Sequence, residues 1–170
     1  MMPTYSAAVV IFNDDRTKIV LHQREDFRVW ALPGGSIEAE ETASEAAIRE
    51  TLEETGYAVA LRRKVGEYWR PQLPQGGNRS VCFAGYVIGG KSLTRGAETV
   101  RVAWFPLDQL PVRLHIFSRE VIRDAVLENQ PPVYRTQLVS SLEALLIRVL
   151  LWLRDLRNRV RTQVRSWMSG

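Results

Sequence analysis

Residues 34–57, GGSIEAEETASEAAIRETLEETGY, constrain the fold of this 170-residue chain more than any other stretch. A glycine pair opens the segment, and the residues after it favour one helix over about residues 42–55. Thr42 suits the N-cap of that helix, because Glu45 stands three positions later and completes a capping box. Gly56 suits the C-cap, since glycine readily adopts the left-handed conformation that ends many helices. The segment therefore predicts a loop that leads directly into a helix.

The predicted helix carries Glu50, Glu53 and Glu54 near its C-terminal end. Residues three and four apart are neighbours on a helix, so these three side chains converge. Each like-charged pair costs roughly 0.2–0.5 kcal/mol, and the helix macrodipole disfavours anions at this end. Folding gives little reason for the arrangement, whereas a bound cation explains it. The alternative is a solvated charged face, which leaves the glycine pair unexplained.

The rest of the chain up to about residue 130 predicts strands and a second helix. Strands are expected over residues 5–12, 18–24, 28–32, 57–70, 79–90 and 100–105, and a helix over residues 114–129. The first two strands flank turn-like residues and are expected to form a hairpin. This order predicts a mixed α/β domain over residues 1–130, without the βαβ alternation of dinucleotide-binding folds.

The spacing within residues 35–57 resembles the Nudix box. All seven fixed positions of that pattern are present, at Gly35, Glu41, Arg49, Glu50, Glu53, Glu54 and Gly56. Thr51 and Tyr57 depart from the pattern, which has aliphatic residues at both positions. The Thr51 hydroxyl is expected to bond back to the carbonyl of Ala47. The resemblance covers about residues 5–130 and implies a Nudix-type α/β/α sandwich with a mixed sheet.

The resemblance to Nudix hydrolases also implies a reaction, which is attack of water on a diphosphate linkage with Mg²⁺ or Mn²⁺ as cofactor. The implied metal ligands are Glu50, Glu53, Glu54 and the carbonyl of Gly35, which suit cations that prefer oxygen. Arg49 is expected to orient the glutamates, and Glu41 to anchor the loop before the helix. Glu98 is the candidate general base outside the box, with a further metal ligand or an exposed loop carboxylate as alternatives.

The substrate implied is a small nucleotide, such as an ADP-ribose-like compound, a nucleotide sugar or a nucleoside triphosphate, and a nucleic acid only as a capped RNA end. Candidates for holding its phosphates are Arg24, Arg28, Arg70 and Arg79, and each is explained equally well as a plain surface arginine. Trp30, Tyr68 and Trp69 are candidates for stacking on a base or for core packing, and core packing is favoured for Trp30. His22, His115 and Cys82 are predicted to be structural. The rival hypothesis is a non-catalytic ligand-sensing or scaffold module that acts through its C-terminal helix.

Cysteine usage and charge limit which cellular compartments and which partners are expected for the protein. Cys82 is the only cysteine, which excludes an intrachain disulfide and a multi-cysteine zinc site and suits the cytoplasm. The N-terminus has no basic segment before its apolar run, so no secretory signal is expected. The net charge of +4 lies entirely in residues 138–170, where six arginines face two acidic residues. The basic balance therefore does not indicate a nucleic-acid partner for the main domain.

Residues 131–170 are predicted to be a linker followed by a basic amphipathic helix. Within residues 138–167, apolar side chains recur three or four residues apart, beside a second stripe of arginines. Such a helix suits self-association as a homodimer or docking on the domain. It also suits peripheral contact with an anionic surface such as the inner face of the membrane.

Overall fold

The structure is a computed structural model of the 170-residue chain. It describes residues 3–74, 76–93 and 99–140, together with residues 143, 145, 149 and 152. The elements in chain order are β1 (Thr4–Phe12), β2 (Lys18–Arg24), β3 (Trp30–Ala31), β4 (Gly34–Ser36), α1 (Ala43–Thr55), β5 (Tyr57–Arg70), β6 (Asn78–Gly90), β7 (Thr99–Pro106), α2 (Ser118–Val126) and β8 (Val133–Thr136). The strands expected from sequence are all confirmed, within one or two residues at most ends.

The described strands form one mixed sheet in the order β3-β2-β1-β6-β5-β8, with β4 added to β1 and β7 added to β2. β1 runs parallel to β6, and β5 runs antiparallel to β6 and parallel to β8. β1 and β2 are antiparallel, as the predicted hairpin requires, but they pair only where Phe12 meets Ile19. The strands then diverge, which leaves the far end of β1 free to pair with β4.

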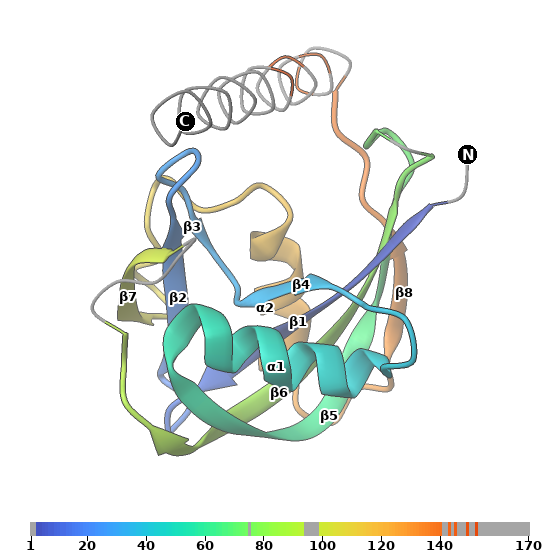
Figure 1. The fold of residues 1–170 in the computed structure, drawn as a ribbon. Helices are drawn as coiled ribbons and strands as arrows, with labels where there is room; N and C mark the ends of the chain where they lie inside the picture. The colour runs from blue at the N-terminus through green and yellow to red at the C-terminus, as the bar shows by residue number, and fades with distance from the viewer. Residues whose placement is uncertain are drawn as a thin grey trace, which may run out of the picture.

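The two helices cover opposite faces of the sheet (Figure 1). α1 packs Ala46 and Ala47 against a cluster that includes Val9, Ile11 and Val59. α2 packs against the other cluster through its apolar face, which consists of Val121, Ile122 and Ala125. Small side chains on α1 let the helix backbone approach the sheet closely, so its position relative to β1 is fixed by packing. The α/β/α layering is therefore as predicted.

The local signals around α1 are confirmed. Thr42 is the N-cap and forms the complete capping box with Glu45, and Gly56 ends the helix with φ 77°. The Thr51 hydroxyl donates to the carbonyl of Ala47 at 2.7 Å. Because both ends and one internal turn are pinned by these bonds, the carboxylates on α1 stand on a rigid support.

The second helix is shorter than the predicted span of residues 114–129. It starts at Ser118, because the chain before it pairs with β3: Trp30 N–H donates to the Arg113 carbonyl, and His115 N–H donates to the Trp30 carbonyl. It ends at Val126, where the Arg63 guanidinium caps its last carbonyls. Long-range bonds therefore override the apolar periodicity at both ends.

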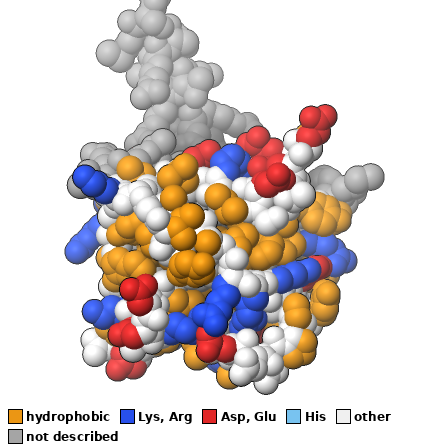
Figure 2. All heavy atoms as spheres, turned by 90° about the horizontal axis from the view of Figure 1, so that it is seen from below, with side chains coloured by type: hydrophobic (Ala, Val, Ile, Leu, Met, Phe, Trp, Pro, Cys, Tyr) orange, Lys and Arg blue, Asp and Glu red, His pale blue; other side chains and the backbone are white. Residues whose placement is uncertain are grey.

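Two strands were absent from the sequence prediction, β4 and β8. β8 pairs with β5, so the sheet continues past residue 130, where the predicted domain ends. Most of the helix predicted for residues 138–167 lies outside the described residues. No helix in the described part of the chain is long and apolar enough to span a bilayer. On the face seen from below, basic and acidic side chains are interspersed with hydrophobic ones, so that face is not uniformly basic (Figure 2).

Candidate active site

The glycine pair of β4 lies directly against the carboxylates of α1. Gly34 N–H donates to Glu54 Oε2 at 2.8 Å. At Gly35, an added Cβ would lie within 2.6 Å of a carboxylate oxygen of Glu50. β4 is held in this place by its pairing with β1, in which Ala7 is opposite Gly35. Glycine is required at position 35 because only a residue without a side chain lets this carboxylate come so close.

Arg49 fixes two of the carboxylates, those of Glu41 and Glu50. Its guanidinium donates two bonds to Glu41, at 3.1 and 2.7 Å, one to Glu50 Oε1 at 3.0 Å and one to the Ser36 carbonyl at 3.1 Å. The Arg49 hydrogen bonds hold the pKa of the Glu41 carboxyl below its usual range, helped by the backbone N–H of Glu38. The same bonds raise the pKa of Arg49. The hydrogen bonds of the Arg49 guanidinium therefore orient the glutamates and the loop before α1.

The three glutamates near the C-terminal end of α1, Glu50, Glu53 and Glu54, differ in their surroundings. The side chains of Glu50 and Glu54 are 17% and 8% exposed, whereas that of Glu53 is 59% exposed and lies 3.5 Å from Arg49. The structure thus brings Glu50 and Glu54 to the glycine pair and leaves Glu53 on the outer flank. The described part of the chain holds no cluster of three or more His, Cys, Asp or Glu side chains that could hold a metal. Glu98 lies outside the described residues.

His22 lies behind Glu54, although its sequence context indicated only a structural role. The residue is 1% exposed, its Nδ1 is 3.0 Å from Thr99 Oγ1, and its Nε2 is 3.4 Å from Glu54 Oε2. Among the described residues, Nε2 of His22 is the one fully buried side-chain nitrogen or oxygen without a hydrogen-bond partner. Burial, with the nearby Arg24, lowers the pKa of His22 to about 4, so the ring is neutral at neutral pH. A neutral imidazole therefore faces the buried carboxylate.

The residues at the glycine pair fit a hard divalent cation. Mg²⁺ and Mn²⁺ take carboxylate and carbonyl oxygens together with water and phosphate. The Glu50 carboxylate lies close to the backbone of Gly35, where a Cβ would block it. This contact brings a carboxylate near the backbone, which carries the carbonyl oxygens that a cation site also uses. Glu54 adds a second carboxylate beside the pair, and Glu53 is accessible from solvent.

A cavity of about 150 Å³ adjoins the glycine pair. One wall is apolar and includes Ala8, Leu32 and Val121, and the polar groups on its lining include Arg24, Arg70 and His115. Burial and the two arginines lower the pKa of His115 to about 4, so His115 is also neutral at neutral pH. His115 was predicted from sequence to be structural, and the folded chain places it on the lining of this cavity. The glycine pair thus lies between the α1 carboxylates and a cavity that has one apolar wall and two arginines on its lining.

Two of the predicted phosphate-binding arginines lie away from this cavity. Arg28 is exposed in the turn between β2 and β3 and has φ 53°. Arg79 is exposed with its guanidinium 4.7 Å from the Trp69 ring centre, and it lines a separate hollow of about 200 Å³. Arg24 does line the cavity and is paired with Asp26 at 3.0 Å.

Tyr68, a candidate for base stacking or for core packing, lies in the core and does not face a substrate site. Tyr68 is fully buried, and its hydroxyl donates to Asp124 Oδ2 at 2.9 Å. Both faces of its ring are therefore occupied by the core. Trp30 packs against Phe105 with ring centres 4.7 Å apart, so it is a packing residue, which was the favoured alternative.

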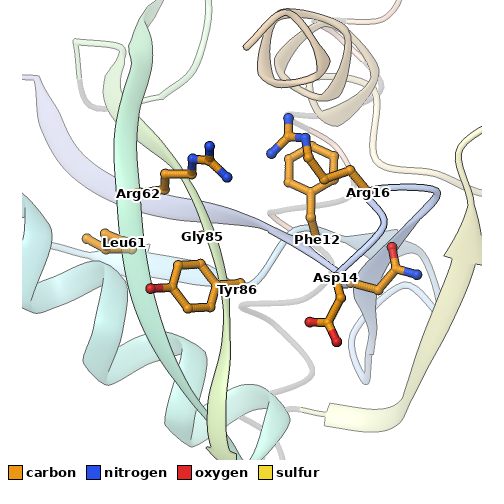
Figure 3. A pocket seen from close by; sticks show the side chains of 8 residues that line it. Phe12, Asp14, Arg16, Leu61, Arg62, Gly85 and Tyr86 are labelled. Atoms are coloured by element: carbon orange, nitrogen blue, oxygen red, sulfur yellow. The ribbon is translucent and has the colours of Figure 1, made fainter.

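A third hollow, of about 400 Å³, lies at the other end of β5 (Figure 3). Its two arginines already serve the fold. Arg16 donates to the Ala125 carbonyl at 3.2 Å and pairs with Glu128 at 3.1 Å, and Arg62 lies 3.7 Å from the same carboxylate. This hollow is lined by neither the glycine pair nor the α1 carboxylates, so it is separate from the candidate site.

Comparison with known proteins agrees with this geometry. The NUDIX domain family matches residues 2–125. A Bacillus subtilis protein provisionally named an 8-oxo-dGTP diphosphatase is 40% identical over 111 residues, which are 65% of this chain and 72% of the relative. The ADP-ribose pyrophosphatase of Methanocaldococcus jannaschii is 32% identical over 124 residues, 72% of each chain. A crystal structure of an ADP-ribose pyrophosphatase from Streptococcus suis superposes with a TM-score of 0.63 at 25% identity, covering 80% of this chain and 100% of the other.

These matches place the protein among the hydrolases that act on a diphosphate linkage. The chain belongs to the Nudix hydrolase family, which typically uses a divalent metal and acts on nucleotides.

Proposed function

We propose that the protein hydrolyses the diphosphate linkage of a purine nucleoside diphosphate derivative and releases a nucleoside monophosphate. The observation that carries the proposal is the position of the 150 Å³ cavity beside Gly35, against which the Glu50 carboxylate lies. A nucleobase in the cavity leaves its phosphates at the carboxylates, where the linkage is cleaved. The size of the space suits one ring system.

The relatives support the nature of the substrate. The names of the Bacillus subtilis and Methanocaldococcus jannaschii proteins describe a purine nucleoside triphosphate and a purine nucleoside diphosphate derivative, respectively. Both compounds contain a diphosphate linkage next to a nucleoside. A nucleoside triphosphate and an ADP-ribose-like compound are therefore the two leading substrates, ahead of nucleotide sugars.

We assign the metal to Glu50, Glu53, Glu54 and the carbonyl of Gly35. When bound, Mg²⁺ or Mn²⁺ neutralises charge on the phosphate oxygens and lowers the pKa of a bound water. The chain's own residues hold the carboxylates in place: Arg49 donates to Glu50, and Gly34 N–H donates to Glu54. Glu98 stays our candidate for the general base.

The test is incubation of the purified protein with purine and pyrimidine nucleoside triphosphates, ADP-ribose and nucleotide sugars, with Mg²⁺ or Mn²⁺. Chromatography of the products should show a nucleoside monophosphate from at least one purine compound. Glu53→Gln and Glu54→Gln should each reduce its formation by several orders of magnitude with an unchanged circular dichroism spectrum. Absence of turnover with every compound would refute the proposal and favour a ligand-sensing module.

The C-terminal segment carries a second proposal, that residues 138–167 form an amphipathic helix for self-association or for peripheral membrane contact in the cytoplasm. Ser140 and Glu143 support a helix start, since Ser140 N–H donates to Glu143 Oε2 at 2.8 Å and Glu143 N–H donates to Ser140 Oγ at 3.3 Å. Sedimentation with anionic lipid vesicles should separate the full chain from a chain that ends at Gln137. Equal non-binding by both would remove the membrane role.

A further inference from the structure

Arg70, the last residue of β5, presents a positive charge to the cavity beside the glycine pair. Its side chain is held from behind by neutral groups. Nε donates to Gln137 Oε1 at 2.8 Å, and Nη1 donates to Asn78 Oδ1 at 3.1 Å. The guanidinium lies 4.6 Å from the centre of the Phe117 ring, on its face. These contacts fix the plane of the guanidinium.

The charge of Arg70 is not balanced by a direct carboxylate partner. Within the described part of the chain, Arg70 makes no ion pair within 4.0 Å, whereas Arg24 on the same cavity is paired with Asp26. Glu120 is reached only through Gln137, whose Nε2 donates to Glu120 Oε2 at 2.9 Å. Burial lowers the pKa of Arg70 below its usual value, which shows that the fold does not compensate this charge fully.

The Arg70 guanidinium also has N–H donors that bind no acceptor among the described residues. A guanidinium has five N–H donors, and only two of those of Arg70 reach acceptors among the described residues. Arg70 lines the cavity, and none of its nitrogens is a fully buried atom without a partner in the described structure, so its remaining donors are accessible to solvent. A half-buried, fixed arginine with free donors suits a ligand that presents two acceptors side by side.

The two acceptors that Arg70 would bind belong to the base of the nucleotide rather than to its phosphates. On the proposed function, the phosphates lie at Glu50 and Glu54 beside the glycine pair. The walls of Ala8, Leu32 and Val121 suit the flat face of a ring. An arginine that meets the rim of such a ring can pair with O6 and N7 of guanine, whereas adenine presents a donor at the position of O6.

We propose that Arg70 is a specificity residue, which reads the acceptor edge of a guanine-type base and makes the enzyme prefer guanine over adenine nucleotides. The inference rests on the proposed function and deepens it. A bidentate pair of this kind discriminates roughly 10- to 100-fold between bases, because the wrong base leaves the arginine unpaired.

The test compares kcat/KM for dGTP and dATP in the wild type, Arg70→Lys and Arg70→Gln. The wild type should prefer dGTP roughly 10- to 100-fold. Lysine keeps the charge but lacks the planar pair of donors, so Arg70→Lys should bring the ratio close to one. Glutamine pairs with adenine, so Arg70→Gln should favour dATP.

Arg62→Gln is the matched control, because Arg62 is an exposed arginine of the same strand that lines a different hollow (Figure 3). It should leave the dGTP-to-dATP ratio at the wild-type value. Thermal melting of each variant separates loss of fold from loss of selectivity, and Arg70→Lys keeps the test valid if Arg70→Gln fails to fold.

Three outcomes overturn the inference. The first is a wild type without preference between dGTP and dATP, and the second is a changed dGTP-to-dATP ratio in Arg62→Gln. The third is an equal loss of kcat/KM for both nucleotides in Arg70→Lys, which would mean that Arg70 binds a phosphate. In each of them turnover persists and the proposed function stands. If no nucleotide is turned over, the proposed function fails, and titration calorimetry with dGMP and dAMP without metal still decides the inference. Tighter binding of dGMP that is lost in Arg70→Lys supports it, and equal binding overturns it.

Discussion

Replacement of Gly35 by alanine should lower activity about 100-fold while leaving the fold almost intact. The added Cβ would lie within 2.6 Å of a carboxylate oxygen of Glu50, whereas ordinary contacts start at 3.4 Å. The Glu50 carboxylate must therefore move by roughly 1 Å, and a misplacement of that size costs on the order of 10²-fold in rate. That loss corresponds to about 2.7 kcal/mol of transition-state stabilisation.

The cost to folding should be small, because the group that moves is the end of a flexible side chain. The expected change in the free energy of unfolding is at most about 1 kcal/mol, the range of substitutions that bury no new polar group. Gly34→Ala is different, since its Cβ would lie 2.6 Å from the backbone Cα of Ala8. Gly35→Ala should therefore lower activity without a large loss of stability, whereas Gly34→Ala should lower both.

The assay measures kcat/KM with the best nucleotide substrate and the unfolding midpoint in urea for Gly35→Ala. Gly89→Ala is the control, because its nearest neighbour would be the Cβ of Ala58 at 4.0 Å. Gly89→Ala should keep both values. Full activity in Gly35→Ala would show that the contact between Glu50 and β4 plays no part in the reaction.

Other predictions concern the rest of the fold. Asp124→Asn should lower the free energy of unfolding by about 1–3 kcal/mol at neutral pH, since Asp124 accepts bonds from Tyr68 and Arg135. Those bonds hold the pKa of Asp124 below its usual value, so its contribution is present above about pH 4 and is lost as the pH falls through the folded pKa. Urea unfolding should show the gap between variant and wild type closing in acid, and a gap independent of pH would contradict the assignment. Burial raises the pKa of the Cys82 thiol to about 11, so a thiol reagent should label it only after unfolding, and rapid labelling of the native protein would count against its core position. Thr42→Ala removes the N-cap of α1 and should cost about 0.5–2 kcal/mol by thermal melting, whereas an unchanged Tm would argue against the capping box.

Local chemistry made much of this molecule predictable from sequence. The caps of α1, its length and the bond from Thr51 to Ala47 depend on residues at most four apart. The approach of Gly35 to Glu50 followed from a family resemblance rather than from the residues alone, and the structure supplies its physical reason.

What sequence could not show depends on contacts between distant segments. His22 and Thr99 meet across 77 positions, and Arg70 and Gln137 across 67. A histidine in an apolar strand gives no signal of the carboxylate it will face. The role of Tyr68 stayed open for the same reason, since its partner Asp124 is on α2. The short strand β8 carries no long apolar pattern and exists because β5 offers it an edge.

The central claim is that the α1 carboxylates beside the glycine pair hold a divalent cation for the reaction. Titration with Mn²⁺, followed by electron paramagnetic resonance of the free ion, tests this claim most directly. The wild type and Glu128→Gln, whose carboxylate pairs with Arg16, should bind Mn²⁺ equally, and binding should be strongly weakened in Glu54→Gln. Equal binding of Mn²⁺ by Glu54→Gln and the wild type, with nucleotide present, would contradict the account.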